Sequence, residues 1–152
     1  MKSLFIVLFL FIPYAGMAQN DNDSLYRAVV KNDTILIKQL IKEGADVNYV
    51  KQDGWVKVNL LITAINAKSF RAAKLLIDNK VDVNWKDGFH TTALMYAASN
   101  GREDIVKLLL STGADVTIKD KQGNDALSAA KESKNTKVIE LIVQAQRESK
   151  QL

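Results

Sequence analysis

Residues 91–116 read TTALMYAASNGREDIVKLLLSTGADV, and this stretch decides the fold. Leu94, Ala97 and Ala98 mark a short first helix, which Gly101 breaks. A second helix follows and ends at Gly113. Its apolar positions are Ile105, Val106, Leu108, Leu109 and Leu110. The pattern predicts a unit of helix, turn, helix and loop.

The same unit recurs along the chain with a period close to 33 residues. Leu61, Leu94 and Leu127 are 33 residues apart, and the loop strings GADVN (44–48), KVDVN (80–84) and GADVT (113–117) repeat with their aspartates 36 and then 33 residues apart. A fixed period of this size is typical of a stacked repeat array. Each unit then buries its apolar face against its neighbours.

The repeated unit resembles that of the ankyrin repeat family, and the resemblance covers almost all of the chain after residue 18. The best match runs from Thr92 through Asn100 and Gly101 to Gly113, Ala114 and Asp115. The family's proline and histidine are replaced in the second, third and fourth units. Their positions hold Leu60, Ala93 and Ala126, and Ile62, Met95 and Ser128. The resemblance implies an all-α ankyrin-repeat solenoid of helix-turn-helix units with β-turn-like finger loops.

Four units are predicted, at about 20–50, 51–85, 86–118 and 119–152, with polar caps at both ends. The three extra residues between the first two aspartates must lie between Asn48 and Leu61. The loop 49–59 is therefore predicted to be longer than the loops 85–91 and 119–125, and we call these three segments the finger loops. Insertions in repeat proteins fall on loops, often on the binding face.

Composition excludes several classes of chemistry. The 152 residues contain no cysteine and one histidine, which excludes disulfides, thiolate zinc sites and multi-histidine metal sites. The net charge of +4 is well below the clustered basic excess of a nucleic-acid-binding protein. We therefore expect no cofactor, no metal and no nucleic-acid partner.

The first eighteen residues are predicted to be a cleavable signal peptide. Lys2 precedes an apolar run from Leu4 to Ile12, and the segment ends in small residues before a polar stretch. The nine-residue run spans about 14 Å at 1.5 Å per residue, too short for a hydrocarbon core of about 30 Å. Cleavage is expected after Ala18, leaving 19–152 as the repeat domain and placing the protein in the periplasm or outside the cell. An uncleaved anchor is the alternative.

Two sets of polar residues invite a catalytic interpretation. Asp46, Asp82 and Asp115 occupy equivalent repeat positions, where an aspartate after a helix commonly accepts hydrogen bonds from backbone amides. Asn48 and Asn84 are expected to shape the same loops, because asparagine tolerates a positive φ. His90 stands in the second finger loop near Asp87, as a lone titratable group.

The finger loops also contain the candidate binding residues. Aromatic side chains supply much of the binding energy where proteins meet, and four of them fall in the first two finger loops. The predicted surface consists of Tyr49, Trp55, Trp85 and Phe89 with Val56, Lys57, Lys86, His90 and Lys121 around them. The alternative is that Trp55 and Trp85 only pack against each other.

The ankyrin resemblance adds the first-helix positions that line the concave face in that family. In this chain they are Asn66, Ala67, Ser99, Asn100, Glu132 and Ser133. The function expected is a non-enzymatic, monomeric protein-binding module, for instance an inhibitor or immunity protein. Two alternatives stay open: a small enzyme that uses His90 with Asp87, and a self-associating envelope protein.

Overall fold

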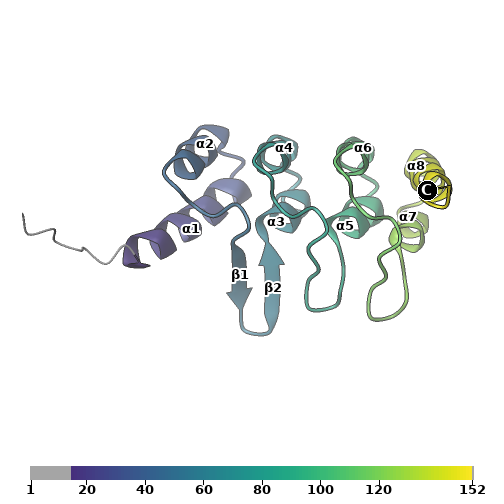
Figure 1. Cartoon of the computed structure of the whole chain (residues 1–152), viewed down its shortest axis with the longest axis horizontal. Helices are drawn as coiled ribbons and strands as arrows, with labels where there is room; N and C mark the ends of the chain where they lie inside the picture. The colour runs from purple at the N-terminus through teal and green to yellow at the C-terminus, as the bar shows by residue number, and fades with distance from the viewer. Residues whose placement is uncertain (1–14, 152) are drawn as a thin grey trace, which may run out of the picture.

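A computed structural model describes residues 15–151, which form a row of paired helices (Figure 1). The inner helices are α1 (Ala15–Val30), α3 (Leu60–Asn66), α5 (Ala93–Ser99) and α7 (Ala126–Ser133). The outer helices are α2 (Thr34–Lys42), α4 (Phe70–Asp78), α6 (Glu103–Ser111) and α8 (Thr136–Ser149). The helix-turn-helix pattern and the solenoid are confirmed.

Three inner helices begin at equivalent capping residues. The side chains of Asn59, Thr92 and Asp125 accept hydrogen bonds from the backbone N–H groups of the third residue along, in α3, α5 and α7 respectively. Such a side chain satisfies an N–H group that has no partner within the helix. The cap is retained although Leu60, Ala93 and Ala126 take the place of the family's proline, a residue suited to the first helical position.

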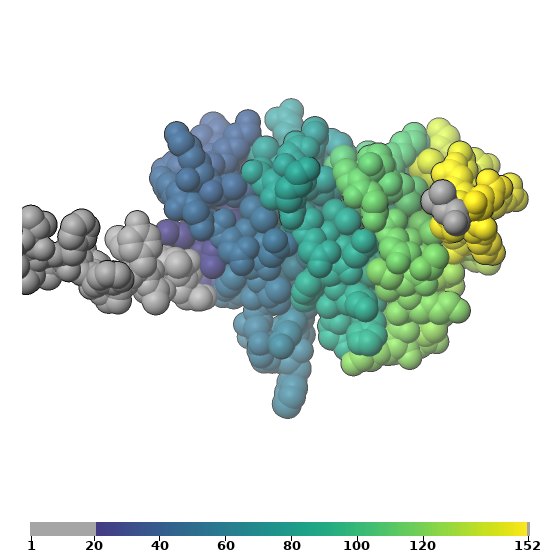
Figure 2. Space-filling model, in the orientation of Figure 1, coloured from purple at the N-terminus to yellow at the C-terminus, as the bar shows by residue number. Residues whose placement is uncertain are grey.

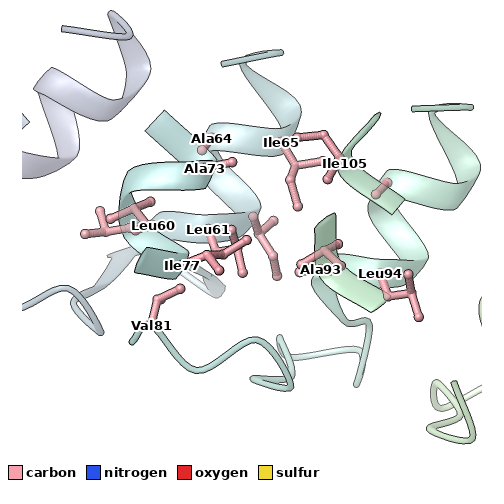
Figure 3. Close-up of a cluster of buried hydrophobic side chains, with 14 of the residues drawn as sticks. Leu60, Leu61, Ala64, Ile65, Ala73, Ile77, Val81, Ala93, Leu94 and Ile105 are labelled. Atoms are coloured by element: carbon pink, nitrogen blue, oxygen red, sulfur yellow. The ribbon is translucent and has the colours of Figure 1, made fainter. Parts of the chain in front are cut away.

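The core runs through the row between the inner and outer helices. Figure 3 shows how Leu61, Ile65 and Ile77 of one pair lie close to Ala93 and Ile105 of the next. Small side chains such as Ala64, Ala73 and Ala97 are fully buried and let the helices approach closely. The 33-residue repeat therefore places equivalent apolar side chains at successive interfaces, and each pair is stabilised by its neighbours.

The first finger loop is a small β-hairpin within the otherwise helical solenoid. Strand β1 (Val50–Asp53) pairs antiparallel with β2 (Val56–Asn59), Val50 opposite Asn59 and Asp53 opposite Val56. Gly54 has φ +57° at the first position of the two-residue turn, where a hairpin favours glycine. The predicted insertion lies here, and Figure 2 shows the hairpin protruding beyond the neighbouring finger loops.

The loop aspartates have the structural role expected of them. Asp46, Asp82 and Asp115 each accept a hydrogen bond from the backbone N–H two residues further along, at 2.8 to 2.9 Å. The prediction for Asn48 and Asn84 is wrong in its geometry, because neither has a positive φ. Their side chains instead accept hydrogen bonds from the backbone of the next unit.

The amino-terminal end differs from a fully polar cap. Val30, Ile35 and Leu36, on α1 and α2, are exposed. Most of the predicted signal peptide, residues 1–14, lies outside the described residues, and the predicted cleavage position after Ala18 falls within α1. Across residues 15–151, no helix combines the length and the apolar character that a membrane crossing requires.

Candidate functional site

The three finger loops project from the same side of the row, opposite the outer helices (Figure 1). The tip of the hairpin carries the most exposed apolar side chain among them, that of Trp55. Trp55 has a relative exposure of 101% and Val56 of 60%, and Lys57 beside them is also exposed. The tip therefore presents an indole and an isopropyl group to solvent, at a place where neither contributes to the core.

The base of the hairpin is fixed to α1 by polar contacts. The Tyr49 hydroxyl and the Lys51 Nζ both donate to Asp23 Oδ1, each at 2.8 Å. Lys51 Nζ also lies 5.9 Å from the centre of the Tyr26 ring. The hydrogen bonds from Lys51 and then Tyr49 hold the pKa of Asp23 below its usual value, and the bond to Asp23 raises the pKa of Lys51. Tyr49 is half-buried, and the bond from its hydroxyl to Asp23 helps to fix the base of the hairpin.

The four predicted aromatic residues therefore divide into two pairs. Trp85 is half-buried and, like Tyr49, packs against the hydrophobic core. Phe89 is 63% exposed and belongs with Trp55 to the accessible surface of the finger loops. Because Trp55 is fully exposed, the alternative in which it packs against Trp85 is wrong.

Asp87 organises the second finger loop. The residue is only 7% exposed, and its Oδ1 accepts hydrogen bonds from the backbone N–H groups of Phe89 and Thr91, both at 2.8 Å. Oδ2 accepts a bond of 2.9 Å from the Tyr96 hydroxyl on α5. Burial, followed by this hydrogen bond, raises the pKa of Tyr96 to about 12. The carboxylate is thereby committed to holding the loop on the helix.

His90 follows this turn and is exposed. Its backbone has φ +65°, and its N–H donates to the Asp87 carbonyl oxygen at 2.9 Å. A left-handed conformation is uncommon outside glycine, and histidine is among the residues enriched there. The enzyme alternative paired His90 with Asp87, whose Oδ1 is bonded to loop amides and whose Oδ2 is bonded to Tyr96 on α5. Among the described residues, no group of three or more histidine, cysteine or acidic side chains is arranged to hold a metal ion.

The third finger loop repeats this construction and is joined to the second. Asp120 Oδ1 accepts hydrogen bonds from the backbone N–H groups of Gln122 and Asn124, at 2.9 and 2.8 Å. The backbone N–H of Lys121 donates to the Phe89 carbonyl oxygen at 2.9 Å, which fixes the relative position of the two loops. The side chains of Lys121 and Lys86 are exposed on them.

The concave side contains a depression of about 220 Å³ between α5 and α7. Ser99 and Glu132, two positions suggested by the ankyrin resemblance, line it together with Tyr96 and Asp120. Asn66 is exposed at the end of α3 and does not line this depression. The structure thus brings the third finger loop and the concave helix face together in one surface, which sequence reasoning treated separately.

Comparison with known proteins gives one consistent result. The sequence model of a family described as ankyrin repeats (3 copies) matches residues 25–120 and 61–151. Ankyrin repeat protein R664 of Acanthamoeba polyphaga mimivirus is 35% identical over 100 residues, covering 64% of this chain and 62% of that protein. Ankyrin repeat and SAM domain-containing protein 6 of Rattus norvegicus is 40% identical over 94 residues, covering 58% of this chain and 10% of that protein.

A third relative, serine/threonine-protein kinase 12 of Arabidopsis thaliana, is 32% identical over 105 residues. That match covers 69% of this chain and 21% of the kinase. The chain thus spans less than two thirds of the length of each of these relatives. The likeness concerns the repeated helical unit.

Proposed function

The chain belongs to the ankyrin repeat family, whose repeats are protein-interaction modules, and on this premise we propose that it binds a partner protein through its finger loops and concave helix face. The observation that carries the proposal is the exposure of Trp55 at the tip of a hairpin longer than its neighbours. Exposed aromatic side chains are common centres of binding energy.

The rigidity of the loops supports the same proposal. Asp23 holds the base of the hairpin, Asp87 holds the second finger loop and Asp120 shapes the third. A surface already fixed in its bound shape loses less conformational entropy when a partner binds. The exposed side chains of Lys57, Lys86, His90 and Lys121 lie on the same finger loops as Trp55 and Phe89. We expect them to supply the polar rim that surrounds the apolar centre of many protein interfaces.

We further propose that the protein acts outside the cytoplasm as an inhibitor or immunity protein. The amino-terminal sequence, with Lys2, the apolar run 4–12 and the small residues up to Ala18, supports export. A binding module that blocks a toxin or an enzyme needs only shape and chemical complementarity. Fractionation of cells that express the full chain tests the export step, with an amino terminus at Gln19 as the expected result in the exported fraction.

Affinity capture tests the binding function. The full chain with a carboxyl-terminal tag serves as one bait, and the variant with Trp55→Ala and Phe89→Ala serves as the other. We expect one protein from the native organism to be retained by the first bait and lost from the second. Because Trp55 touches no core residue, its substitution is not expected to unfold the chain. Retention of the same protein by both baits would show that this aromatic pair is not the binding site.

A further inference from the structure

The outer helices α2 and α4 lie on the side of the row opposite the finger loops (Figure 1). A second groove is formed by residues of these two helices. Its volume is about 230 Å³. Phe70 and Leu75 of α4 are half-buried against the core and also line the groove. Because an apolar cavity of about 150 Å³ is large enough to bind benzene, this groove has room for one aliphatic or aromatic side chain.

Cations surround this apolar lining. Lys38 of α2 and Arg71 and Lys74 of α4 line the groove, and Asp78 is its one acidic residue. Asp78 is neutralised by Lys74, whose Nζ lies 3.0 Å from Asp78 Oδ2. Within residues 15–151, neither Lys38 nor Arg71 forms an ion pair. The groove therefore carries two uncompensated positive charges beside an apolar pocket.

The equivalent groove between α6 and α8 provides a comparison within the same chain. There Glu103 and Glu140 face Lys107 and Lys137, so the charges balance. Lys107 and Glu103 form an ion pair across one turn of α6. The excess of positive charge at α2 and α4 is thus a local property and does not follow from the repeat itself.

We propose that the groove between α2 and α4 is a second interaction surface, which binds an acidic segment of a partner protein. One apolar side chain of the segment fills the space beside Phe70 and Leu75, and its carboxylates pair with Lys38 and Arg71. A guanidinium group such as that of Arg71 matches the geometry of a carboxylate. A hollow of this size suits a single inserted side chain better than the flat surface of a lipid bilayer. This surface is independent of the finger loops.

A peptide-binding experiment tests the proposal on the full chain. The probe is a fluorescein-labelled peptide of glutamate and leucine, compared with a lysine and leucine peptide and with a glutamate and serine peptide of equal length. Fluorescence anisotropy at low salt is expected to show binding of the first peptide only. The double variant Lys38→Glu with Arg71→Glu should weaken that binding at least tenfold. Both side chains are exposed, and circular dichroism checks that the variant is folded.

The matched control is Lys107→Glu with Lys137→Glu in the balanced groove, which should leave the affinity unchanged. Equal weakening by the two double variants would overturn the proposal, because attraction to net charge alone would then explain the binding. Equal binding of the lysine and leucine peptide or of the glutamate and serine peptide would also overturn it.

A vesicle-binding experiment tests whether the groove binds a lipid surface instead of a protein segment. Vesicles of phosphatidylserine are offered to the wild-type chain and to an Ile35→Ser variant, since Ile35 on α2 is 80% exposed but does not line the groove. We expect no vesicle binding by either protein. Vesicle binding that depends on Ile35, together with no binding of the glutamate and leucine peptide, would replace the proposed protein segment with a membrane.

Discussion

Asn48 Oδ1 accepts a hydrogen bond of 2.7 Å from the backbone N–H of Asp82, which is 34 residues further along the chain. Asn84 makes the same contact with Asp115 at 2.8 Å, and Asn22 with Asp46 at 2.8 Å. Each aspartate in turn accepts a bond from the amide two residues later. The bonds of Asn48 and Asn84 therefore connect consecutive units, and the bond of Asn22 connects α1 to the loop at the end of its own unit.

The variant Asn48→Ala is expected to lower the free energy of unfolding by about 0.5–1.5 kcal/mol, because the Asp82 amide loses its acceptor. Urea denaturation measures the change, and Asn84→Ala should behave alike. Asn66→Ala, at an exposed position at the end of α3, serves as the control and should change the stability by less than about 0.5 kcal/mol. Equal effects of Asn48→Ala and Asn66→Ala would show that the inter-unit bond contributes nothing.

Replacing the two tryptophans by alanine is expected to change the free energy of unfolding by different amounts. Trp55→Ala should change the free energy of unfolding by less than about 0.5 kcal/mol, since the side chain is fully exposed. Trp85→Ala should lower it by about 2 kcal/mol, roughly half the loss for a fully buried tryptophan. Urea denaturation followed by circular dichroism measures both. Trp85→Phe leaves Trp55 as the single tryptophan, which acrylamide should quench efficiently; protection from acrylamide would contradict its exposure.

Tyr96 should ionise late in an alkaline titration. Its pKa in the folded chain is about 12 against an ordinary value of 10, because burial and the bond to Asp87 favour the neutral hydroxyl. A raised pKa gives stability that is fully present below pH 10 and is lost as the pH rises to about 12. The tyrosinate absorbance of the wild type should include one tyrosine that ionises near pH 12, and this tyrosine should be absent from the titration of Tyr96→Phe. A difference centred near pH 10 would disprove the contact.

The pKa of Asp23 should depend on Lys51. The hydrogen bonds from Lys51 and Tyr49 lower it, so this carboxyl adds stability above its unfolded-state pKa, which is lost as the pH falls through the lower folded-state value. Replacing Lys51 by Gln should move the pKa of Asp23 back toward 3.8, measured by NMR of the carboxyl carbon. Lys57→Gln, on the opposite strand of the hairpin, is the control and should leave that pKa unchanged.

The protein is expected to be a monomer in solution. Sedimentation velocity at increasing concentrations of the full chain should give one constant sedimentation coefficient. A rise with concentration that Trp55→Ala abolishes would favour self-association through the finger loops. That result would support the alternative of a self-associating envelope protein.

Much of this architecture was predictable because the signals are local and repeated. The period of Leu61, Leu94 and Leu127 fixes the helix pairs, and the shift between the aspartates locates the insertion. The role of Asp46, Asp82 and Asp115 also follows from their neighbours, since each binds an amide two residues away. Such contacts depend on short stretches of sequence.

The parts that were missed depend on contacts between distant residues. The role of Asn48 involves an amide 34 residues away, and the half-burial of Trp85 depends on how the units stack. The left-handed positions include Lys68, Lys80 and Lys134, residue types that carry no signal for that geometry. Within the candidate site, sequence placed Tyr49 in the correct loop, but its bond to Asp23, 26 residues earlier, was not predictable.

The hairpin tip at Gly54 and Trp55 lies outside the packed row, and its base is held independently by Asp23. Trp55 and Val56 can therefore be substituted at little cost to folding, whereas Gly54, with φ +57°, is constrained by the geometry of the turn. These two side chains face few structural constraints, whereas the residues of the repeats are constrained by their packing. If the partner is a rival's toxin or a host enzyme, coevolution with that partner would be expected to change the sequence at this tip more than elsewhere in the chain.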